Sequence, residues 1–325
     1  MDRKGLLEFL GKDWTEVQSL IYDSLRSEIP LLQTTNDSLI GHSGKQLRPI
    51  LCLLMARACN GGVATPDSLC YAAASELLHN ATLLHDDVTD ESSTRRGEPT
   101  LWARFGASPA VLVGDFWLSK AVEMVIGAES RDRVLKFFSS TMSDLAEGEM
   151  LQLERSGDGS TTEEDYFRII RCKTASLFRA SIVSAAVSAD ASEEKTDAAG
   201  EYADALGVAF QIKDDILDYC GAPEMGKPSG VDIRERKVTL PLLGAFRNCP
   251  QREREIRKAL IGAPGSPELC SVIHNFAVEN GGLEYASSVL DSYIDRAVRA
   301  LDIFENSREK DYLAEIARYN ALRTV

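Results

Sequence analysis

Two short acidic clusters are the part of the sequence best suited to chemistry. Residues 86–90 and 214–218 share the pattern DDxxD, which places three aspartates within each cluster. On a helix the first and fifth positions lie on one face and the second lies beside them, so the carboxylates crowd into one patch. A divalent cation relieves that repulsion, and oxygen ligands without a cysteine or histidine pair favour Mg²⁺ over zinc. Each cluster therefore predicts a magnesium site.

A single cluster of this kind has a simple alternative, a solvated acidic helix end, because runs of charge are usually exposed surface. The repetition argues against that alternative. Both clusters follow an apolar stretch, at residues 81–84 and 207–210, and both precede a loop with basic and turn-forming residues. We therefore expect two helix ends that present their carboxylates in the same way.

Basic residues near the clusters would complete a site for a diphosphate group. They are Arg95 and Arg96 after the first cluster, Lys173 between the clusters, and Lys227 and Lys237 after the second. A bound diphosphate needs cations at its outer oxygens while Mg²⁺ takes the inner ones. The alternative is that Lys173 is an ordinary surface lysine and that the two arginines only offset nearby acids.

A second anion site is predicted near the N-terminus. Residues 44–49 have the sequence GKQLRP and place Lys45 and Arg48 on a turn that leads into an apolar helix. No pair of carboxylates lies beside these cations in the sequence. The pattern indicates a site that binds an anion without a metal ion.

The elements that must position these residues are helices. Apolar residues recur at helical spacing along nearly the whole chain, as at Leu283, Ala286, Leu290, Tyr293 and Ala297, and convincing strand-like alternation is absent. Clusters of Gly, Pro, Ser and Asp interrupt the pattern, and roughly ten or more helices fit between them. None of these breaks resembles a flexible linker, so we expect residues 1–325 to form a single all-α domain.

The overall composition excludes other classes of protein. The 325 residues include 36 Lys and Arg against 50 Asp and Glu, a formal net charge of −14 that argues against a basic nucleic-acid binder. The seven cysteines contain no CxxC pair, which is typical of reduced thiols in the cytoplasm. Uncharged stretches are far shorter than the roughly 20 residues of a membrane helix, so no stable membrane insertion is expected.

In their order along the chain these motifs resemble the trans-polyprenyl diphosphate synthases, above all the medium- and long-chain members. The resemblance extends from about residue 40 to 245, and it rests on residues 44–49, 79, 85–90, 95–97, 114–115, 148–149, 152, 173–174, 211–218, 226–228, 232 and 237–241. It implies an isoprenoid synthase-type helical bundle around a central cavity. It also implies a homodimer that condenses isopentenyl diphosphate with an allylic diphosphate, farnesyl or geranylgeranyl diphosphate, using three Mg²⁺ ions in each active site.

The same resemblance assigns roles to individual residues. The metal ligands would be Asp86, Asp87, Asp90, Asp214 and Asp218, with Asp215 as a further ligand or an outer acid. The leaving diphosphate would be stabilised by Arg95, Lys173 and Lys227, and isopentenyl diphosphate would be held by Lys45, Arg48, His79 and Arg96. The border of the site would be formed by Thr174, Gln211 and Lys237. For His79 the alternative is a core or capping residue, although it stands two turns before Asp86 on nearly the same face.

Product length would be set by the helix that leads to the first cluster. Ala81 and Thr82 lie about one turn before Asp86, beneath the site, where the family places a large aromatic side chain to stop short products. The small Ala81 therefore implies a long product of about six to ten isoprene units, each matching about one 5.4 Å helical turn. The alternative is that small side chains here only permit close helix packing.

One position departs from the family pattern, because Arg236 stands where the family commonly has a glycine before Lys237. Glycine tolerates backbone angles that arginine adopts reluctantly, which makes loop closure over the site less certain. Three alternative functions stay open: a shorter-chain geranylgeranyl synthase, a non-catalytic subunit of a heteromeric synthase, and a terpene cyclase. The intact second DDxxD cluster argues against the last two.

Overall fold

The computed structural model describes residues 2–41, 44–95, 97–220 and 230–322. The α-helices in these ranges are α1 (Arg3–Leu10), α2 (Lys12–Ser24), α3 (Pro30–Gly41), α4 (Leu47–Cys59), α5 (Pro66–Thr89), α6 (Leu101–Phe105), α7 (Ala107–Gly127), α8 (Arg131–Asp158), α9 (Glu163–Ile170), α10 (Ser176–Ser188), α11 (Glu193–Cys220), α12 (Val231–Arg234), α13 (Leu240–Asn248), α14 (Glu253–Gly262), α15 (Pro267–Glu279), α16 (Gly282–Ala300) and α17 (Arg308–Leu322). The shorter elements are the π-helix η1 (Arg171–Ala175), the 3₁₀-helix η3 (Pro250–Arg252) and the antiparallel strands β1 (Thr94–Arg95) and β2 (Glu98–Pro99). The expected all-α fold with ten or more helices is confirmed.

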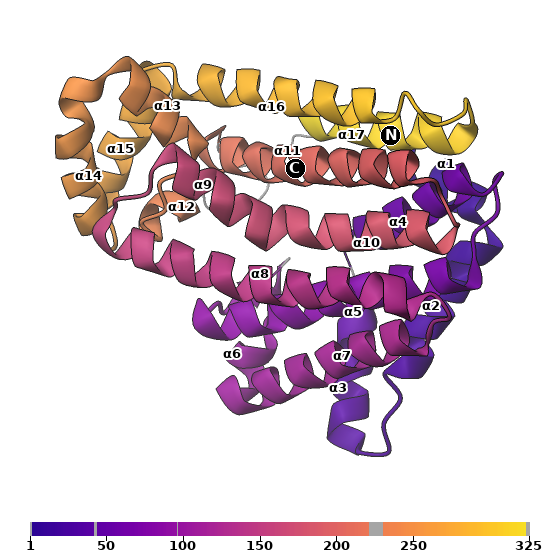
Figure 1. The fold of residues 1–325 in the computed structure, drawn as a ribbon. Coiled ribbons are helices and arrows are strands. Elements are labelled where there is room, and N and C mark those ends of the chain that lie inside the picture. Colours follow the sequence, from indigo (N-terminus) through magenta and orange to yellow (C-terminus); the bar gives the residue numbers. More distant parts are fainter. Residues whose placement is uncertain (1, 42–43, 96, 221–229, 323–325) are drawn as a thin grey trace.

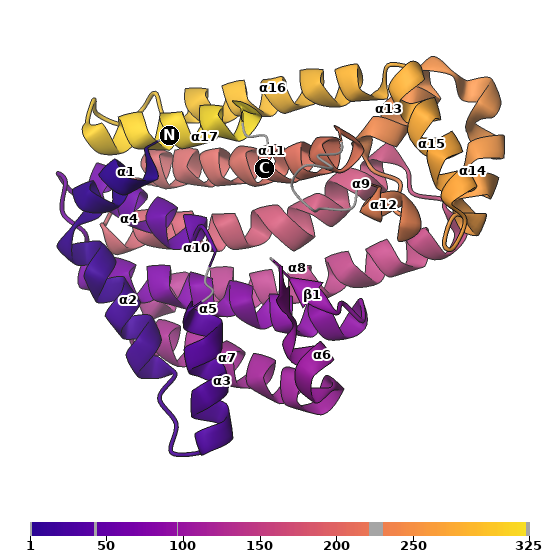
Figure 2. The ribbon, with the colours of Figure 1, turned by 180° about the vertical axis from the view of Figure 1, so that it is seen from behind.

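The long helices lie side by side in layers around α10 (Figures 1 and 2). In both views α16 lies beside α11, α11 lies beside α10, and α8, α5 and α7 follow on the other side. The helices in contact with α10 are α4, α5, α8 and α11. Nearly every residue from 176 to 187 is buried, because a helix surrounded on all sides keeps no polar face.

α11 belongs to two buried clusters of side chains. Residues 199–206 pack with the N-terminal helices, and residues 208–219 pack with α13, α15 and α16. Gly207 lies between the two halves, where a Cβ atom would stand 2.5 Å from the Cα of Ala175. Because no side chain fits in that space, the glycine is what allows α11 to approach η1 and the residues that η1 carries.

Local capping explains where two of the helices begin. α5 starts at Pro66 behind Thr65, whose side chain accepts a hydrogen bond from the Ser68 N–H. α9 starts at Glu163 behind Thr162, which forms a reciprocal capping box with Asp165. These two helices begin where their sequences satisfy the free N–H groups of the first turn.

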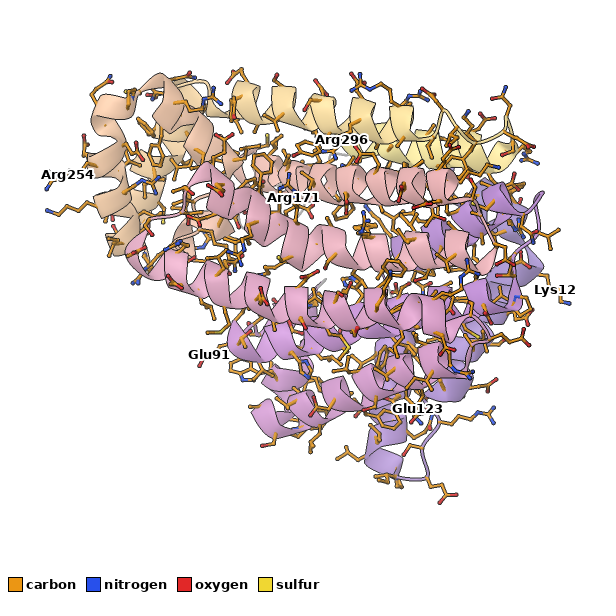
Figure 3. The ribbon with its side chains drawn as sticks, viewed as in Figure 1. Lys12, Glu91, Glu123, Arg171, Arg254 and Arg296 are labelled. Atoms are coloured by element: carbon orange, nitrogen blue, oxygen red, sulfur yellow. The ribbon has the colours of Figure 1, made fainter. Side chains whose placement is uncertain are left out.

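Charged side chains cover the outside of the bundle. Lys12, Glu123 and Arg254 are among those that project away from the ribbon (Figure 3). In the ranges that the structure describes, no helix has both the length and the apolarity that crossing a membrane requires. All seven cysteines are free thiols.

Candidate active site

Both acidic clusters lie at the carboxyl ends of long helices, as predicted. Asp90 caps α5, and its backbone N–H donates to the carbonyl oxygen of Asp86 at 2.8 Å. The second cluster lies in the last two turns of α11, which ends at Cys220. The carboxyl end of a helix carries a partial negative charge, so aspartates there are electrostatically unfavourable without a cation. This placement supports the expectation of two cation sites.

A cavity of about 1010 Å³ lies between the two helix ends. Asp86 reaches it from α5 and Asp214 from α11, so the two clusters face the same space. The predicted site residues that line it are Lys45, Arg48, His79, Thr82, Asp86, Arg95, Lys173, Thr174, Gln211 and Asp214. The fold thus brings together motifs that lie far apart in the sequence.

Asp86 and Asp87 face different sides of α5. Asp86 lines the large cavity, and burial raises the pKa of Asp86 to about 6 although Lys173 acts in the opposite direction. Asp87 is 4% exposed and accepts a hydrogen bond from Arg95 Nε at 2.7 Å. Burial also raises the pKa of Asp87, against the effect of Arg95. The Asp87–Arg95 ion pair therefore forms an edge of the site, with Arg95 in the cavity wall.

The second cluster is held by hydrogen bonds. Asp215 accepts from the Tyr166 hydroxyl at 2.6 Å and from Gln211 Nε2 at 2.9 Å, and Thr174 Oγ1 donates to Gln211 Oε1 at 2.9 Å. Burial raises the pKa of Asp215 to about 7, and the hydrogen bonds from Tyr166 and Gln211 oppose that shift. The sequence motifs identified Thr174 and Gln211 but not Tyr166, which lies on a separate helix, α9.

Asp218 has a different environment from its neighbours in the cluster. Its two carboxylate oxygens accept hydrogen bonds from the backbone N–H groups of Val231 and Asp232, at 3.0 and 3.1 Å. These donors begin the short helix α12. Asp218 therefore joins the end of α11 to the segment that leads to Lys237.

Lys173 reaches the large cavity from the π-helix η1, a distortion that often occurs at functional sites. Its ammonium group forms an ion pair with Glu149 on α8 and donates to Gln152 Oε1 at 3.1 Å. Glu149 and Gln152 belong to the motifs of the family resemblance but were not among the predicted site residues. The signal that would have included them is their spacing of three residues, which puts both on one face of α8.

Lys237 lies between the two clusters. Burial alone would lower the pKa of Lys237, but its ion pair with Glu235 and the nearby carboxylates of Asp232 and Asp90 raise it overall. Burial raises the pKa of Asp90, and Lys237 opposes that effect. The preceding residue, Arg236, has a φ of 59°, in the left-handed region that favours glycine. Arg236 thus has the kind of backbone conformation for which glycine is favoured, and its effect on loop closure stays a prediction.

The predicted metal-free anion site lies at another part of the cavity wall. Arg48 stacks over the ring of Phe178, with 4.6 Å between the guanidinium carbon and the ring centroid. Burial lowers the pKa of Arg48 to about 10, and the carboxylate of Glu76 opposes that effect. Glu76 is itself buried and lines the cavity, although no motif pointed to it. Lys45 and His79 line the same cavity.

Another part of the cavity wall is apolar. It is formed by Leu78, Leu83, Leu118, Met142, Leu145, Leu177 and Phe210. Thr82 is part of this wall, whereas Ala81 is 1% exposed and packs in the core. The two residues expected to control product length therefore differ in their contact with the cavity. Two further predicted site residues, Arg96 and Lys227, lie outside the described residues.

The carboxylates fit Mg²⁺ only together with further ligands. Among the described residues, no three Asp, Glu, His or Cys side chains come close enough to hold a metal ion by themselves. Mg²⁺ in proteins commonly binds one or two carboxylates and completes its octahedron with waters and substrate phosphates. An oxygen-only donor set on two facing helix ends is suited to that mode of binding.

Comparison with known proteins identifies the family. A family model described as polyprenyl synthetase matches residues 29–273. The all-trans-nonaprenyl-diphosphate synthase (geranyl-diphosphate specific) of Rhodobacter capsulatus is 36% identical over 97% of this chain and 96% of that protein. The chain belongs to the polyprenyl synthetase family. The expectation of a chain-elongating polyprenyl diphosphate synthase, made from the motifs, is confirmed.

Solved structures of polyprenyl synthases have the same fold. A decaprenyl diphosphate synthase from Rhodobacter capsulatus superposes with a TM-score of 0.92, at 34% identity, and the match covers 99% of both chains. A polyprenyl synthase from Caulobacter crescentus, in a complex with calcium and isoprenyl diphosphate, has a TM-score of 0.90 at 35% identity, covering 100% of this chain and 98% of that one. Polyprenyl synthetases act on isoprenyl diphosphates and generally use Mg²⁺.

Proposed function

We propose that this polyprenyl synthetase condenses isopentenyl diphosphate with farnesyl or geranylgeranyl diphosphate and repeats the step to make a long all-trans polyprenyl diphosphate. One observation carries the proposal: Asp86 and Asp214, one from each acidic cluster, line the same cavity as Lys45 and Arg48, and a large part of its wall is apolar. The polar parts suit two diphosphate groups. The apolar wall suits a growing hydrocarbon chain.

The proposed metal ligands are Asp86, Asp87, Asp90, Asp214 and Asp218, with three Mg²⁺ ions per site and Asp215 as an outer acid. When bound, Mg²⁺ would neutralise the diphosphate and make it a better leaving group. Asp87 already accepts a hydrogen bond from Arg95, and Asp218 accepts hydrogen bonds from backbone N–H groups. Both can still bind a metal ion, because a carboxylate has about four acceptor positions. The structure of the Caulobacter crescentus polyprenyl synthase contains calcium together with isoprenyl diphosphate, which supports the use of a divalent cation.

The side chains of the cavity would perform three tasks. Arg95, Lys173 and Lys227 would bind the outer oxygens of the allylic diphosphate as its carbon–oxygen bond breaks. Lys45, Arg48, His79 and Arg96 would hold isopentenyl diphosphate so that its double bond faces the allylic cation, while Thr174, Gln211 and Lys237 border the site. The apolar wall would keep water from the cation, and the departing diphosphate would accept the proton that is lost. The fixed cations act where negative charge develops.

Three features of the whole protein are part of the proposal. α11 contributes to both buried clusters, which supports a single domain over residues 1–325. Large apolar side chains project outward from α7 and α8, Leu112 at 68% and Met150 at 66% exposure, which supports a homodimer through these helices. The free thiols support a cytoplasmic location.

Sedimentation of the wild type and of a Met150→Glu variant would test the proposed homodimer. The variant should favour monomers, because it places a charge on the exposed apolar surface of α8.

The decisive experiment is an assay with purified protein, Mg²⁺, farnesyl diphosphate and labelled isopentenyl diphosphate, with product lengths resolved by chromatography. We expect long prenyl diphosphates from the wild type and from Asp132→Asn, an exposed acid on α8, but almost none from Asp86→Asn. Absence of incorporation by the wild type alone would support the non-catalytic subunit. A hydrocarbon or a cyclic alcohol as the product would support the terpene cyclase. A product that stops at geranylgeranyl diphosphate would support the shorter-chain synthase.

A further inference from the structure

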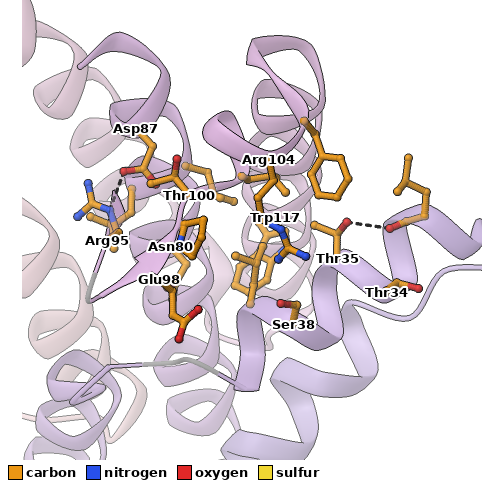
Figure 4. Close-up of a pocket in the computed structure, with 17 residues that line it drawn as sticks. Thr34, Thr35, Ser38, Asn80, Asp87, Arg95, Glu98, Thr100, Arg104 and Trp117 are labelled. Carbon is orange, nitrogen blue, oxygen red and sulfur yellow. Dashed lines mark hydrogen bonds and ion pairs between the residues drawn. The ribbon is translucent and has the colours of Figure 1, made fainter. Parts of the chain in front are cut away.

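A second, smaller cavity lies against a neighbouring face of α5, and Figure 4 shows the residues that line it. It has a volume of about 320 Å³, and its wall comes from α3, α5, α6 and α7 together with β1 and β2. Cavities that bind small molecules have volumes of roughly 300–1,000 Å³. The space is therefore large enough for a small ligand, and the proposed prenyl transfer gives it no task.

Most of the wall of this small cavity is apolar. Leu84, Leu101 and Trp117 are buried, and Leu39 and Leu83 complete this part of the wall. Two of the polar groups in this wall are already bonded inside the protein. The Trp117 indole N–H donates to Asn36 Oδ1 at 2.9 Å, and the Thr35 hydroxyl donates to the Leu31 carbonyl at 2.8 Å. The interior therefore favours a hydrocarbon group.

Two guanidinium groups line the small cavity at different ends (Figure 4). Arg95 lies beside Asp87 and bonds to it. Arg104 lies toward Trp117 and Thr35, apart from Glu98. It is exposed, its guanidinium carbon lies 5.4 Å from the ring centroid of Phe105, and it forms no ion pair with any described residue. A cation without a carboxylate partner at the rim of an apolar cavity suits an anionic head group.

We propose that the small cavity binds a short isoprenoid phosphate, with its hydrocarbon tail among Leu83, Leu84 and Trp117 and its phosphate on Arg104. The site itself is inferred from the cavity wall and its charges. The choice of an isoprenoid as the ligand rests on the proposed function, because such amphipathic anions are the compounds this enzyme would meet at its own active site. A hydrocarbon without a phosphate would leave Arg104 without an anionic partner. Inorganic phosphate would leave the apolar wall of the cavity in contact with water.

The small cavity shares part of its wall with the active-site cavity. Leu83 and Arg95 line both spaces. A tail that packs against Leu83 from one side changes the packing available to a substrate chain on the other, and Arg95 is held by Asp87 of the first acidic cluster. The bound ligand should therefore slow prenyl transfer. This makes the small cavity a feedback site for short isoprenoid phosphates.

Equilibrium binding of geranyl monophosphate to the full-length protein tests the site. The titration is done in EDTA, which prevents metal-dependent binding at the acidic clusters, and the variants distinguish the small cavity from the metal-free anion site at Lys45 and Arg48. We expect Arg104→Ala to weaken the metal-independent binding about tenfold or more, the usual effect of losing one charge-assisted contact to phosphate. Leu31→Trp, which places a large side chain at the exposed rim, should weaken it as well. Arg254→Ala, which removes an exposed arginine far from the cavity, should bind like the wild type (Figure 3).

Steady-state assays give the second readout. Geranyl monophosphate should inhibit the wild type at concentrations that fill the small cavity, and Arg104→Ala should need about tenfold more inhibitor while its uninhibited rate stays normal. Equal binding and equal inhibition in the wild type, Arg104→Ala and Leu31→Trp would overturn the proposal. Binding that depends on Arg104 without any inhibition would overturn the feedback role. If Arg104→Ala has a normal rate without the inhibitor, prenyl transfer itself is intact. A failure of binding or of inhibition would then concern the small cavity and leave the proposed function standing.

Discussion

The Tyr166 hydroxyl donates a hydrogen bond of 2.6 Å to Asp215, a buried carboxylate in the second acidic cluster. Tyr166 lies on α9 and Asp215 on α11, so the contact joins two helices at the site. The ring of Tyr166 also packs against that of Phe167, with their centroids 5.3 Å apart. The contact therefore contributes to packing and holds the orientation of Asp215.

Tyr166→Phe should separate these two contributions, because it keeps the ring and removes the donor. We expect the free energy of unfolding to fall by about 1–3 kcal/mol, since a buried carboxylate loses a partner. We also expect the enzyme to need a higher Mg²⁺ concentration for half-maximal activity. Denaturant unfolding and a Mg²⁺ titration of the rate measure these effects. Tyr202→Phe, which removes a hydroxyl bonded to the Leu313 carbonyl, should lose stability without changing the Mg²⁺ requirement.

In the metal-free enzyme, Asp215 should contribute a loss of stability as the pH rises from about 4 to 7. Burial raises the pKa of Asp215 to about 7, so the folded protein holds a proton there that the unfolded chain has already released. The contribution of Asp215 to the free energy of unfolding therefore decreases across this interval. Thermal unfolding in EDTA should show a smaller decrease for Asp215→Asn than for the wild type. A parallel decrease in both proteins would contradict the assignment, and Asp132→Asn serves as the exposed control.

Replacing Lys173 should impair prenyl transfer more than it impairs folding. The ammonium group lies in the cavity between Glu149 and Gln152, where it would meet the leaving diphosphate. We expect Lys173→Ala to lower kcat by about 10²-fold or more, the usual scale for losing one fixed electrostatic contact in an active site. Lys136→Ala removes an exposed lysine on α8 and should leave kcat unchanged. An unaffected rate in Lys173→Ala would mean that this lysine is a structural partner of α8.

Product length should respond directly to Thr82, which lines the cavity. Thr82→Phe should shorten the products, because a ring at this position blocks the apolar part of the space. Thr82→Val keeps the shape and should leave the length unchanged. Ala81→Phe tests the expectation made from the sequence: shorter products would support it, and unchanged products would show that Ala81 belongs to the core alone. Chromatography of the dephosphorylated products measures the length.

The left-handed backbone at Arg236 should tolerate glycine better than a β-branched residue. Arg236→Val should be less stable than Arg236→Gly by about 1–2 kcal/mol, because a branched side chain clashes at positive φ. Thermal unfolding of the two variants measures the difference. Equal stability of both would show that the neighbouring loop adopts another backbone conformation in solution.

Much of the site could be predicted because the motifs lie on helices. Helical spacing places Asp86, Asp90 and His79 on related faces of α5, and the end of each apolar stretch predicts where the carboxylates become accessible. Chemistry then limits the ligand, since oxygen donors and surrounding cations suit Mg²⁺ and diphosphate. The family resemblance supplied the reaction, and the comparisons confirmed it.

The partners of these residues could not be predicted in the same way. Glu149, Tyr166 and Glu76 come from α8, α9 and α5, and nothing in their local sequence shows which neighbour they contact. The same limit applies to Ala81 and Thr82. They are adjacent on one helix, yet one packs in the core and the other lines the cavity.

The sequence by itself determined the all-α class, the two acidic helix ends and the family, because each follows from residue types at short, regular spacing. Only the tertiary structure decided that Asp86 and Asp214 share one cavity, while Asp87 accepts a hydrogen bond from Arg95 and Asp215 accepts one from Tyr166. The physical reason is that helical periodicity specifies directions along one helix. Which of those directions meets a cavity, a cation or the core depends on how distant helices pack around it.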